Sequence, residues 1–263
     1  MNDIRGEFFI CSSVQEIDKC LKQNIGEGYE NRNDILYAFD VDDTLIKLNH
    51  PLVQYLNRYG TPYKGLLEKY HRITEMDLRR CLAPYVELTE LGASEWLKSL
   101  KGKKIALTAS QTGECADGTL MTEYRYQELR ERGITFEATF NINSVVLNEL
   151  TYKGQHPTYH KGILFSLRRL EGETSKGAVL CAFLKKIEYT PEWVVLVDDR
   201  EENLKSVRAE LEKQYRDTKF IGILYTGCKK NEPSDNLTED EFKKNAEDLF
   251  KECCRKFNIP EPE

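Results

Sequence analysis

The sequence ILYAFDVDDT, residues 35–44, joins five consecutive apolar residues directly to a cluster of three aspartates. An apolar run without alternating polar residues is typical of a strand that is covered on both faces, as in a parallel sheet. The run ends at Asp40, so the aspartates follow the point where the strand leaves the sheet. This stretch therefore predicts a parallel α/β sheet with acidic groups at the carboxyl end of one strand.

Two further apolar runs have the same character. Residues 105–107 are followed by Thr108, and residues 193–197 are followed by Asp198 and Asp199. Helical periodicity between these runs favours an open, mostly parallel sheet with right-handed crossover connections. Residues 8–10 form a short apolar run. The remaining predicted elements are strands at 134–142 and 220–225, helices at 14–22, 120–132, 176–186, 202–215 and 239–257, and a hairpin that joins 145–150 to 158–167.

The segment between the first two apolar runs has a different pattern. Apolar positions recur at helical spacing over 51–59, 66–73, 76–82 and 90–100, and Gly60, Pro62, Pro84 and Gly92 separate these stretches. Glycine and proline interrupt regular elements. The segment is therefore predicted to be helical and poor in strands.

Composition and charge exclude several function classes. The 263-residue chain has a net charge of −6 and no basic stripe, so it lacks the electrostatic signature of nucleic-acid binding. No stretch approaches the roughly 20 apolar residues of a membrane span, and the first residues lack the basic-then-apolar pattern of a secretory signal. The eight cysteines form no CxxC pair, which favours reduced thiols. We expect a cytoplasmic protein without a nucleic-acid partner or a membrane span.

The residues at the strand ends match the requirements of phosphoryl transfer. A carboxylate such as Asp40 is an ionised oxygen nucleophile at neutral pH, and a second acid, Asp42, can protonate the leaving oxygen and then activate water. Magnesium prefers oxygen ligands and needs only a few carboxylates, a role for which Asp40, Asp198 and Asp199 are candidates. Fixed donors must also hold the phosphate oxygens, and the candidates for this role are Thr108 and Lys176.

Four motifs in this order resemble those of the haloacid dehalogenase (HAD) superfamily of phosphohydrolases. The first is an apolar strand followed by Asp-x-Asp-x-Thr, the second a strand that ends in Thr or Ser, the third a Lys near a helix start, and the fourth a strand that ends in paired acids. In this chain they are FDVDDTL at 39–45, IALT at 105–108, SKG at 175–177 and VVLVDD at 194–199.

The resemblance implies a Rossmann-like sheet, a Mg²⁺ cofactor and an aspartyl-phosphate on Asp40. An acid at Asp42 is similar to the phosphatase branch, and the resemblance implies that Asp42 binds the metal through its main-chain carbonyl. It also ranks Asp199 above Asp198 as a ligand and gives Asn203 a supporting role. The expected division is an HAD-like core at 1–48 and 92–263 with a small helical cap at 49–91.

Several alternatives stay open. Asp43 suits a turn or a helix cap, Ser110 competes with Thr108, and Lys161, Lys185 and Lys186 compete with Lys176. Substrate contact by Arg79, Arg80, Arg125 or His160 is a further alternative, but a surface charge or a hydrogen-bonded side chain explains each of them better.

The predicted activity is hydrolysis of a phosphate monoester that is either a small molecule or a phosphoprotein. Phosphotyrosine, a nucleotide and a sugar phosphate all fit this prediction. The alternatives are a phosphotransferase and a catalytically idle HAD-fold binding module. A looser likeness connects the chain to HAD phosphatases that intracellular bacteria deliver into host cells, which would imply export. No pattern in the sequence specifies an oligomeric state.

Overall fold

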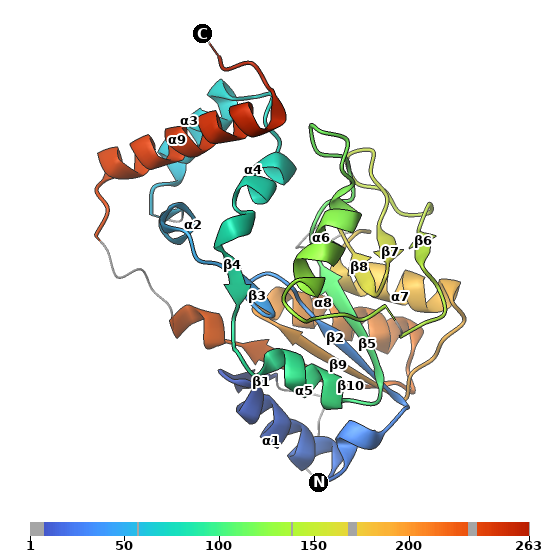
Figure 1. The fold of residues 1–263 in the computed structure, drawn as a ribbon. Coiled ribbons are helices and arrows are strands. Elements are labelled where there is room, and N and C mark those ends of the chain that lie inside the picture. The colour runs from blue at the N-terminus through green and yellow to red at the C-terminus, as the bar shows by residue number, and fades with distance from the viewer. Residues whose placement is uncertain (1–7, 57, 138, 168–172, 231–235, 263) are drawn as a thin grey trace.

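A computed structural model describes residues 8–262, except 57, 138, 168–172 and 231–235. Its described residues form an eight-stranded sheet in which the first six strands in spatial order run parallel and the last two continue antiparallel (Figure 1). The predicted α/β class with a mostly parallel sheet is therefore confirmed. In spatial order the strands are β1 (Phe9–Cys11), β10 (Lys219–Tyr225), β9 (Trp193–Asp198), β2 (Ile35–Phe39), β5 (Lys103–Thr108), β8 (Ile163–Phe165), β7 (Thr158–His160) and β6 (Ser144–Val146).

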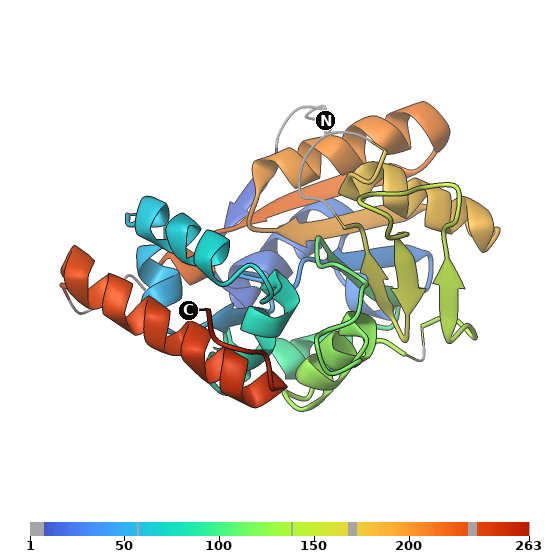
Figure 2. The ribbon, with the colours of Figure 1, turned by 90° about the horizontal axis from the view of Figure 1, so that it is seen from above.

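Helices cover both faces of this sheet (Figure 2). One face packs against α1 (Val14–Ile25), α5 (Ala93–Ser99) and α6 (Met121–Arg130), and the other against α7 (Lys176–Lys186) and α8 (Glu201–Gln214). Successive strand residues point to opposite faces, and all five residues of β2 are buried. This is why the sequence shows β2 as an unbroken apolar run.

A helical unit departs from the sheet after β2. The chain enters it through β3 (Ile46–Leu48) and returns through β4 (Val86–Leu88), which pair antiparallel. Between them lie α2 (Pro51–Tyr55), α3 (Gly60–Lys69), α4 (Glu75–Cys81) and the short 3-10 turn η2 (Ala83–Tyr85). The predicted helical character of the segment between the first two apolar runs is confirmed, although Gly60 and Pro62 lie in the first turn of α3 rather than between helices. Two further 3-10 turns are η1 (Tyr29–Asn31) and η3 (Gly227–Lys230).

The last helix, α9 (Glu239–Phe257), packs on this helical unit rather than on the sheet (Figure 1). Its apolar face, including Phe242 and Phe250, shares one buried cluster with Leu52, Leu66 and Leu78 of α2, α3 and α4. The division expected from the sequence places 239–257 in the core with the rest of 92–263, whereas α9 contacts α2, α3 and α4. The periodicity of α9 predicts that one face is buried but carries no information about which neighbour covers it.

Two predicted strand features differ from the structure. The described residues of 134–142 form turns and bends instead of a strand, and Phe140 packs edge-on against Phe183 and Tyr159. Phe136 stacks on Phe39 of β2, so the apolar character of this segment reflects its packing against the sheet and α7 rather than strand pairing. The segment 158–167 contains two strands, β7 and β8, which turn at Lys161 and Gly162. Both have positive φ, +46° and +89°, as a two-residue hairpin turn requires.

We predict that Gly177→Ala destabilises the fold by about 2 kcal/mol, because overpacking of a close contact costs about 1–3 kcal/mol. A Cβ at Gly177 of α7 would lie 2.2 Å from the main-chain oxygen of Ser206 in α8. Gly65→Ala in α3 is the matched control, because a Cβ there meets nothing within 4 Å. Urea unfolding should show the control equal to or more stable than wild type, and equal stability of both variants would contradict the close packing of α7 and α8.

A second prediction tests how α9 is held. Phe250 is fully buried, and its ring centroid lies 5.1 Å from that of Tyr70 and 5.9 Å from that of Tyr63. Phe250→Ala should cost about 3–5 kcal/mol in the free energy of unfolding, whereas Lys251→Ala on the half-exposed side should change it by less than about 0.5 kcal/mol. A Phe250→Ala cost as small as that of Lys251→Ala in urea titrations would exclude the packing described.

Candidate functional site

The site lies where the direction of the strand connections reverses. From β2 the chain continues to β5 on one side of the sheet, and from its neighbour β9 it continues to β10 on the other. Such a reversal opens a crevice outside the carboxyl ends of the two strands. Asp40 directly follows β2, Asp198 ends β9, and the Asp40 amide donates to the Val197 carbonyl oxygen at 2.8 Å. The two acids therefore meet at the crevice.

Three carboxylates and one ammonium converge there. Oxygen atoms of Asp40, Asp198 and Asp199 all lie within 4.8 Å of one another. Lys176 Nζ donates to Asp40 Oδ1 at 2.6 Å and to Asp198 Oδ2 at 2.7 Å. Lys176 is the first residue of α7, where the side chain of Ser175 caps the helix by accepting from the Ala178 amide at 3.4 Å. The structure thus brings together four of the six predicted site residues.

Burial and charge act in opposite directions on this cluster. Burial raises the pKa of the Asp40 carboxyl well above its usual range; the Lys176 ammonium opposes the rise, and Asp198 and Asp199 add to it. Burial also raises the pKa of Asp199, and repulsion from Asp198 adds to this effect. Burial alone would lower the pKa of Lys176, but the carboxylates of Asp198 and Asp40 reverse this and raise it. The ammonium is therefore held in its charged form.

Positive charge does not fully balance the acids in this part of the described chain. Besides Lys176, Arg200 approaches Asp199 at 4.0 Å, with a side chain that is 41% exposed. Three carboxylates therefore face one close and one distant cation. Buried carboxylates that lie close together raise the free energy of the folded state unless an additional cation compensates their charge. The three carboxylates are close enough together to hold a metal ion through oxygen ligands.

The two adjacent acids at the end of β9, Asp198 and Asp199, have different surroundings. Asp198 is fully buried, and both of its oxygens already accept hydrogen bonds: Oδ2 from Lys176, and Oδ1 from Asn203 Nδ2 at 2.8 Å and the Arg200 amide at 3.0 Å. The Asp199 side chain is 16% exposed. The predicted supporting residue Asn203 thus orients Asp198, while Asp199 faces the more open side.

Thr108 is at the same edge of the sheet but is bonded to different partners. It ends β5, the neighbour of β2, and is buried. Its Oγ1 accepts from the Ser110 amide at 3.2 Å, and its carbonyl oxygen accepts from the Ser166 amide at 2.8 Å. Ser110, the predicted rival for its role, is therefore part of the same turn. The position of Thr108 agrees with the predicted convergence of strand ends, although the hydrogen bonds described above join it to Ser110 and Ser166 rather than to the acids.

Asp42 lies apart from the three clustered acids and is held by two arginines. Its Oδ2 accepts from Arg125 Nη2 at 2.8 Å, and its Oδ1 lies 3.3 Å from Arg79 Nη2. Arg125 is on α6 and Arg79 on α4. Sequence reasoning considered both arginines as surface charges or substrate contacts and missed this pairing. The sequence contained one local indication that Arg125 is paired: Glu128 follows it by three positions, and residues three apart on a helix are neighbours.

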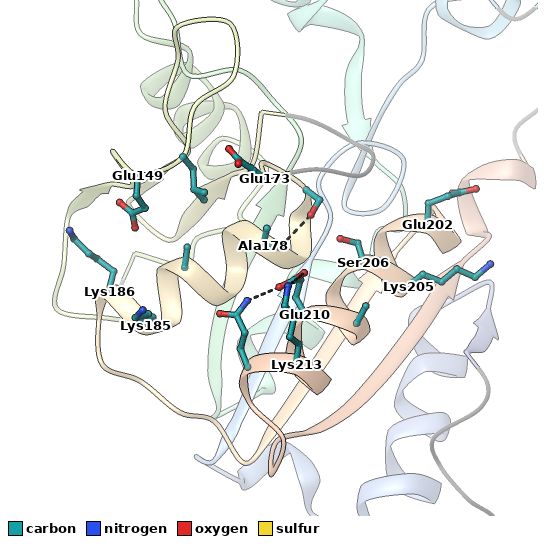
Figure 3. A pocket seen from close by; sticks show the side chains of 15 residues that line it. Glu149, Glu173, Ala178, Lys185, Lys186, Glu202, Lys205, Ser206, Glu210 and Lys213 are labelled. Carbon is teal, nitrogen blue, oxygen red and sulfur yellow. Dashed lines mark hydrogen bonds and ion pairs between the residues drawn. The ribbon is translucent and has the colours of Figure 1, made fainter.

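A separate groove runs along α7 and α8 (Figure 3). It has a volume of about 1320 Å³ and none of the clustered acids lines it. Its charged lining is balanced, with four glutamates and four lysines: Glu149, Glu173, Glu202, Glu210, Lys185, Lys186, Lys205 and Lys213. The balanced charge of this lining does not favour an anionic ligand. Because none of the clustered acids lines the groove either, we do not include it in the candidate site, despite its size.

No helix in the described part of the chain has both the length and the apolar character that a membrane crossing requires.

Comparison with known proteins places the chain in a family. A protein of Rickettsia felis that is described as uncharacterized is 23% identical to it over 242 residues, which cover 88% of this chain and 80% of that protein. No solved structure matches the chain. The family described as "Protein of unknown function (DUF2608)" matches residues 11–252, a range from β1 into α9 that contains the whole candidate site. The chain belongs to the DUF2608 family.

Proposed function

We propose that this protein is a Mg²⁺-dependent phosphatase of the HAD type that hydrolyses phosphate monoesters through an aspartyl-phosphate on Asp40. The observation that carries the proposal is the convergence of Asp40, Asp198 and Asp199 within 4.8 Å of one another at the carboxyl ends of β2 and β9, with the Lys176 ammonium bound to Asp40 and Asp198. The likeness of four sequence motifs to those of HAD phosphohydrolases adds the reaction type.

The donor set suits a hard divalent cation. Its oxygens come from carboxylates, which Mg²⁺ and Ca²⁺ prefer, and no cysteine or histidine belongs to the cluster as described. Asp40 and Asp199 are the better ligands, because both oxygens of Asp198 already accept hydrogen bonds from Lys176, Asn203 and Arg200. A bound Mg²⁺ would neutralise charge on the phosphate and on the carboxylates.

Asp40 is well placed to be the nucleophile. Its side chain is 10% exposed, so one side of the carboxylate is accessible from the crevice. Lys176 binds Oδ1, which fixes the orientation of the group, so that one oxygen can attack phosphorus while the other contacts the metal. In the first step an Asp40 oxygen bonds to phosphorus and the bond to the leaving oxygen breaks. Water then attacks the aspartyl-phosphate, which releases inorganic phosphate and restores the carboxylate.

Asp42 is proposed to move the protons. Its side chain is 41% exposed, so it reaches the open side of the crevice where a leaving group would depart. As an acid it gives a proton to the leaving oxygen, and as a base it then takes one from the attacking water. Thr108, at the end of β5, is proposed to contact a phosphate oxygen. The helical unit beyond β3 and β4 is proposed to act as the cap that selects the substrate.

The two alternative functions differ in how they relate to the site. An idle binding module does not need both Asp40 and Asp42, and this chain retains both. A phosphotransferase shares the first half-reaction and differs only in the acceptor that attacks the aspartyl-phosphate. Addition of candidate alcohols during turnover, with detection of a new phosphoester, distinguishes transfer from hydrolysis.

We predict that the purified protein hydrolyses p-nitrophenyl phosphate in the presence of Mg²⁺ and stops when the metal is chelated. Asp40→Asn should reduce kcat by at least about 10³-fold, because it removes the nucleophile. Asp217→Asn, in an exposed turn after α8, makes the same charge change and should leave kcat unaltered. Near-normal turnover by Asp40→Asn, or full activity with EDTA, would rule out this mechanism.

Metal binding is tested without any substrate. Thermal unfolding of wild-type protein should show a free energy of unfolding that rises by about 2.7 kcal/mol when Mg²⁺ reaches 100 times its Kd. Asp199→Asn should remove most of this rise, and it should leave the metal-free protein as stable as wild type or more stable because repulsion with Asp198 is relieved. Asp217→Asn should respond to Mg²⁺ as wild type does. An equal Mg²⁺ response from Asp199→Asn would remove Asp199 from the metal site.

A further inference from the structure

The carboxylate of Asp42 is held from two separate parts of the molecule. Arg125 binds its Oδ2 at 2.8 Å from α6, which covers the sheet, and Arg79 approaches its Oδ1 at 3.3 Å from α4 of the helical unit. Each arginine engages a different oxygen of the same group. Rotation of the carboxylate about its terminal torsion would therefore weaken both contacts.

A second, buried acid holds the two arginines in place. Glu128 Oε2 lies 3.0 Å from Arg79 Nη2 and also accepts from Arg125 Nη1. Its other oxygen accepts from the Tyr124 hydroxyl at 2.8 Å. The side chains of Arg125 and Glu128 are 1% and 2% exposed. Two arginines and two acids therefore form one charge-balanced network, in which Arg125 and Glu128 are buried away from water.

Stability alone does not account for this network. Arg79 Nε and Nη1 and Arg125 Nε are buried without a hydrogen-bond partner among the described residues. A buried donor without an acceptor costs about 1–3 kcal/mol, and a buried ion pair is often no better than apolar side chains of similar volume. The arrangement instead directs two guanidinium groups at a half-exposed carboxylate two residues after Asp40.

We infer that Arg79 and Arg125 are positioning residues that fix the orientation of the Asp42 carboxylate for proton transfer, an inference that rests on the proposed phosphatase function. The proton that Asp42 gives to the leaving oxygen must travel along a short, aligned hydrogen bond, so orientation governs its efficiency. Arg79 belongs to α4 of the helical unit and Arg125 to α6. Both arginines can therefore contact Asp42 only when the helical unit packs next to α6. A further bond joins α4 to the loop that precedes α6, because Asp77 Oδ1 accepts from the Ala116 amide at 2.8 Å.

A direct contact between Arg79 and the substrate phosphate is the competing explanation. Loss of such a contact weakens the binding of every phosphate ester to the same degree, because all esters carry the same phosphate. Loss of a positioned acid has another signature: it slows esters with a poor leaving group, which need the proton, and spares esters with an activated leaving group. The two explanations therefore differ in how the effect varies with the leaving group.

The experiment compares kcat/KM of wild type and Arg79→Met for phenyl phosphate and p-nitrophenyl phosphate with Mg²⁺ present. We expect kcat/KM for phenyl phosphate to fall at least about 10-fold more than for p-nitrophenyl phosphate, within the about 10²–10⁴-fold that general acid catalysis contributes, with the loss in kcat rather than KM. Arg80→Met is the matched control: Arg80 adjoins Arg79 but pairs with Asp117. It should leave the ratio of the two substrates unaltered. Circular dichroism confirms that the variants are folded.

A double-mutant cycle identifies the residue through which Arg79 acts. In an Asp42→Asn background, Arg79→Met should change kcat/KM for phenyl phosphate by less than about twofold, because the group that it positions is already lost. Arg125→Lys, which keeps the charge at the buried position but not the planar fork, should show the same leaving-group dependence as Arg79→Met.

Two results would overturn the inference. An equal loss on both esters, or a full additional loss in the Asp42→Asn background, would overturn it and leave the proposed phosphatase function standing. Wild-type protein that hydrolyses neither ester would instead overturn the proposed function and this inference together.

Discussion

The buried ion pairs of Lys176 with Asp40 and Asp198 are the interaction on which the candidate site depends. Three carboxylates meet where β2 and β9 end, and burial makes their mutual repulsion costly. Lys176 binds two of them at 2.6 and 2.7 Å and is itself only 1% exposed. Removal of this ammonium would leave buried acids without a close counter-charge. The position of Lys176 at the start of α7, under the Ser175 cap, is therefore as important as its charge.

The acids of the site are divided between two environments. Asp40, Asp198 and Asp199 share the crevice with Lys176, whereas Asp42, two residues after Asp40, turns toward Arg79 and Arg125. This separation lets neighbouring carboxylates take different roles, since each has its own counter-charges. It also connects the helical unit to the site, because Arg79 of α4 and Arg125 of α6 meet at the same carboxylate. The proposed acid–base group thus depends on how two layers of the molecule are packed together.

The sequence predicted much of the core of this protein. Apolar runs located β2 and β9 almost to the residue, because a strand buried on both faces needs apolar side chains at every position. The same reasoning predicted that Asp40, Thr108 and the acids 198–199 gather at one edge, since parallel strands end on the same side. Periodicity located α7 and α9 with their observed bounds. It was wrong at 134–142, where apolar residues pack as an irregular segment and local pattern alone cannot separate a strand from a packed loop.

The residues themselves determined which elements form and which chemical groups stand at their ends. Burial pattern, helix caps and strand ends are local properties, so they are written in short stretches of sequence. Tertiary structure alone decided the partners: α9 covers the helical unit, Asn203 orients Asp198, and Arg79 and Arg125 hold Asp42. Asp42 and Arg125 are 83 positions apart. An ion pair between residues so far apart in the sequence depends on how α6 packs beside the end of β2. The sequence around either residue does not indicate that packing.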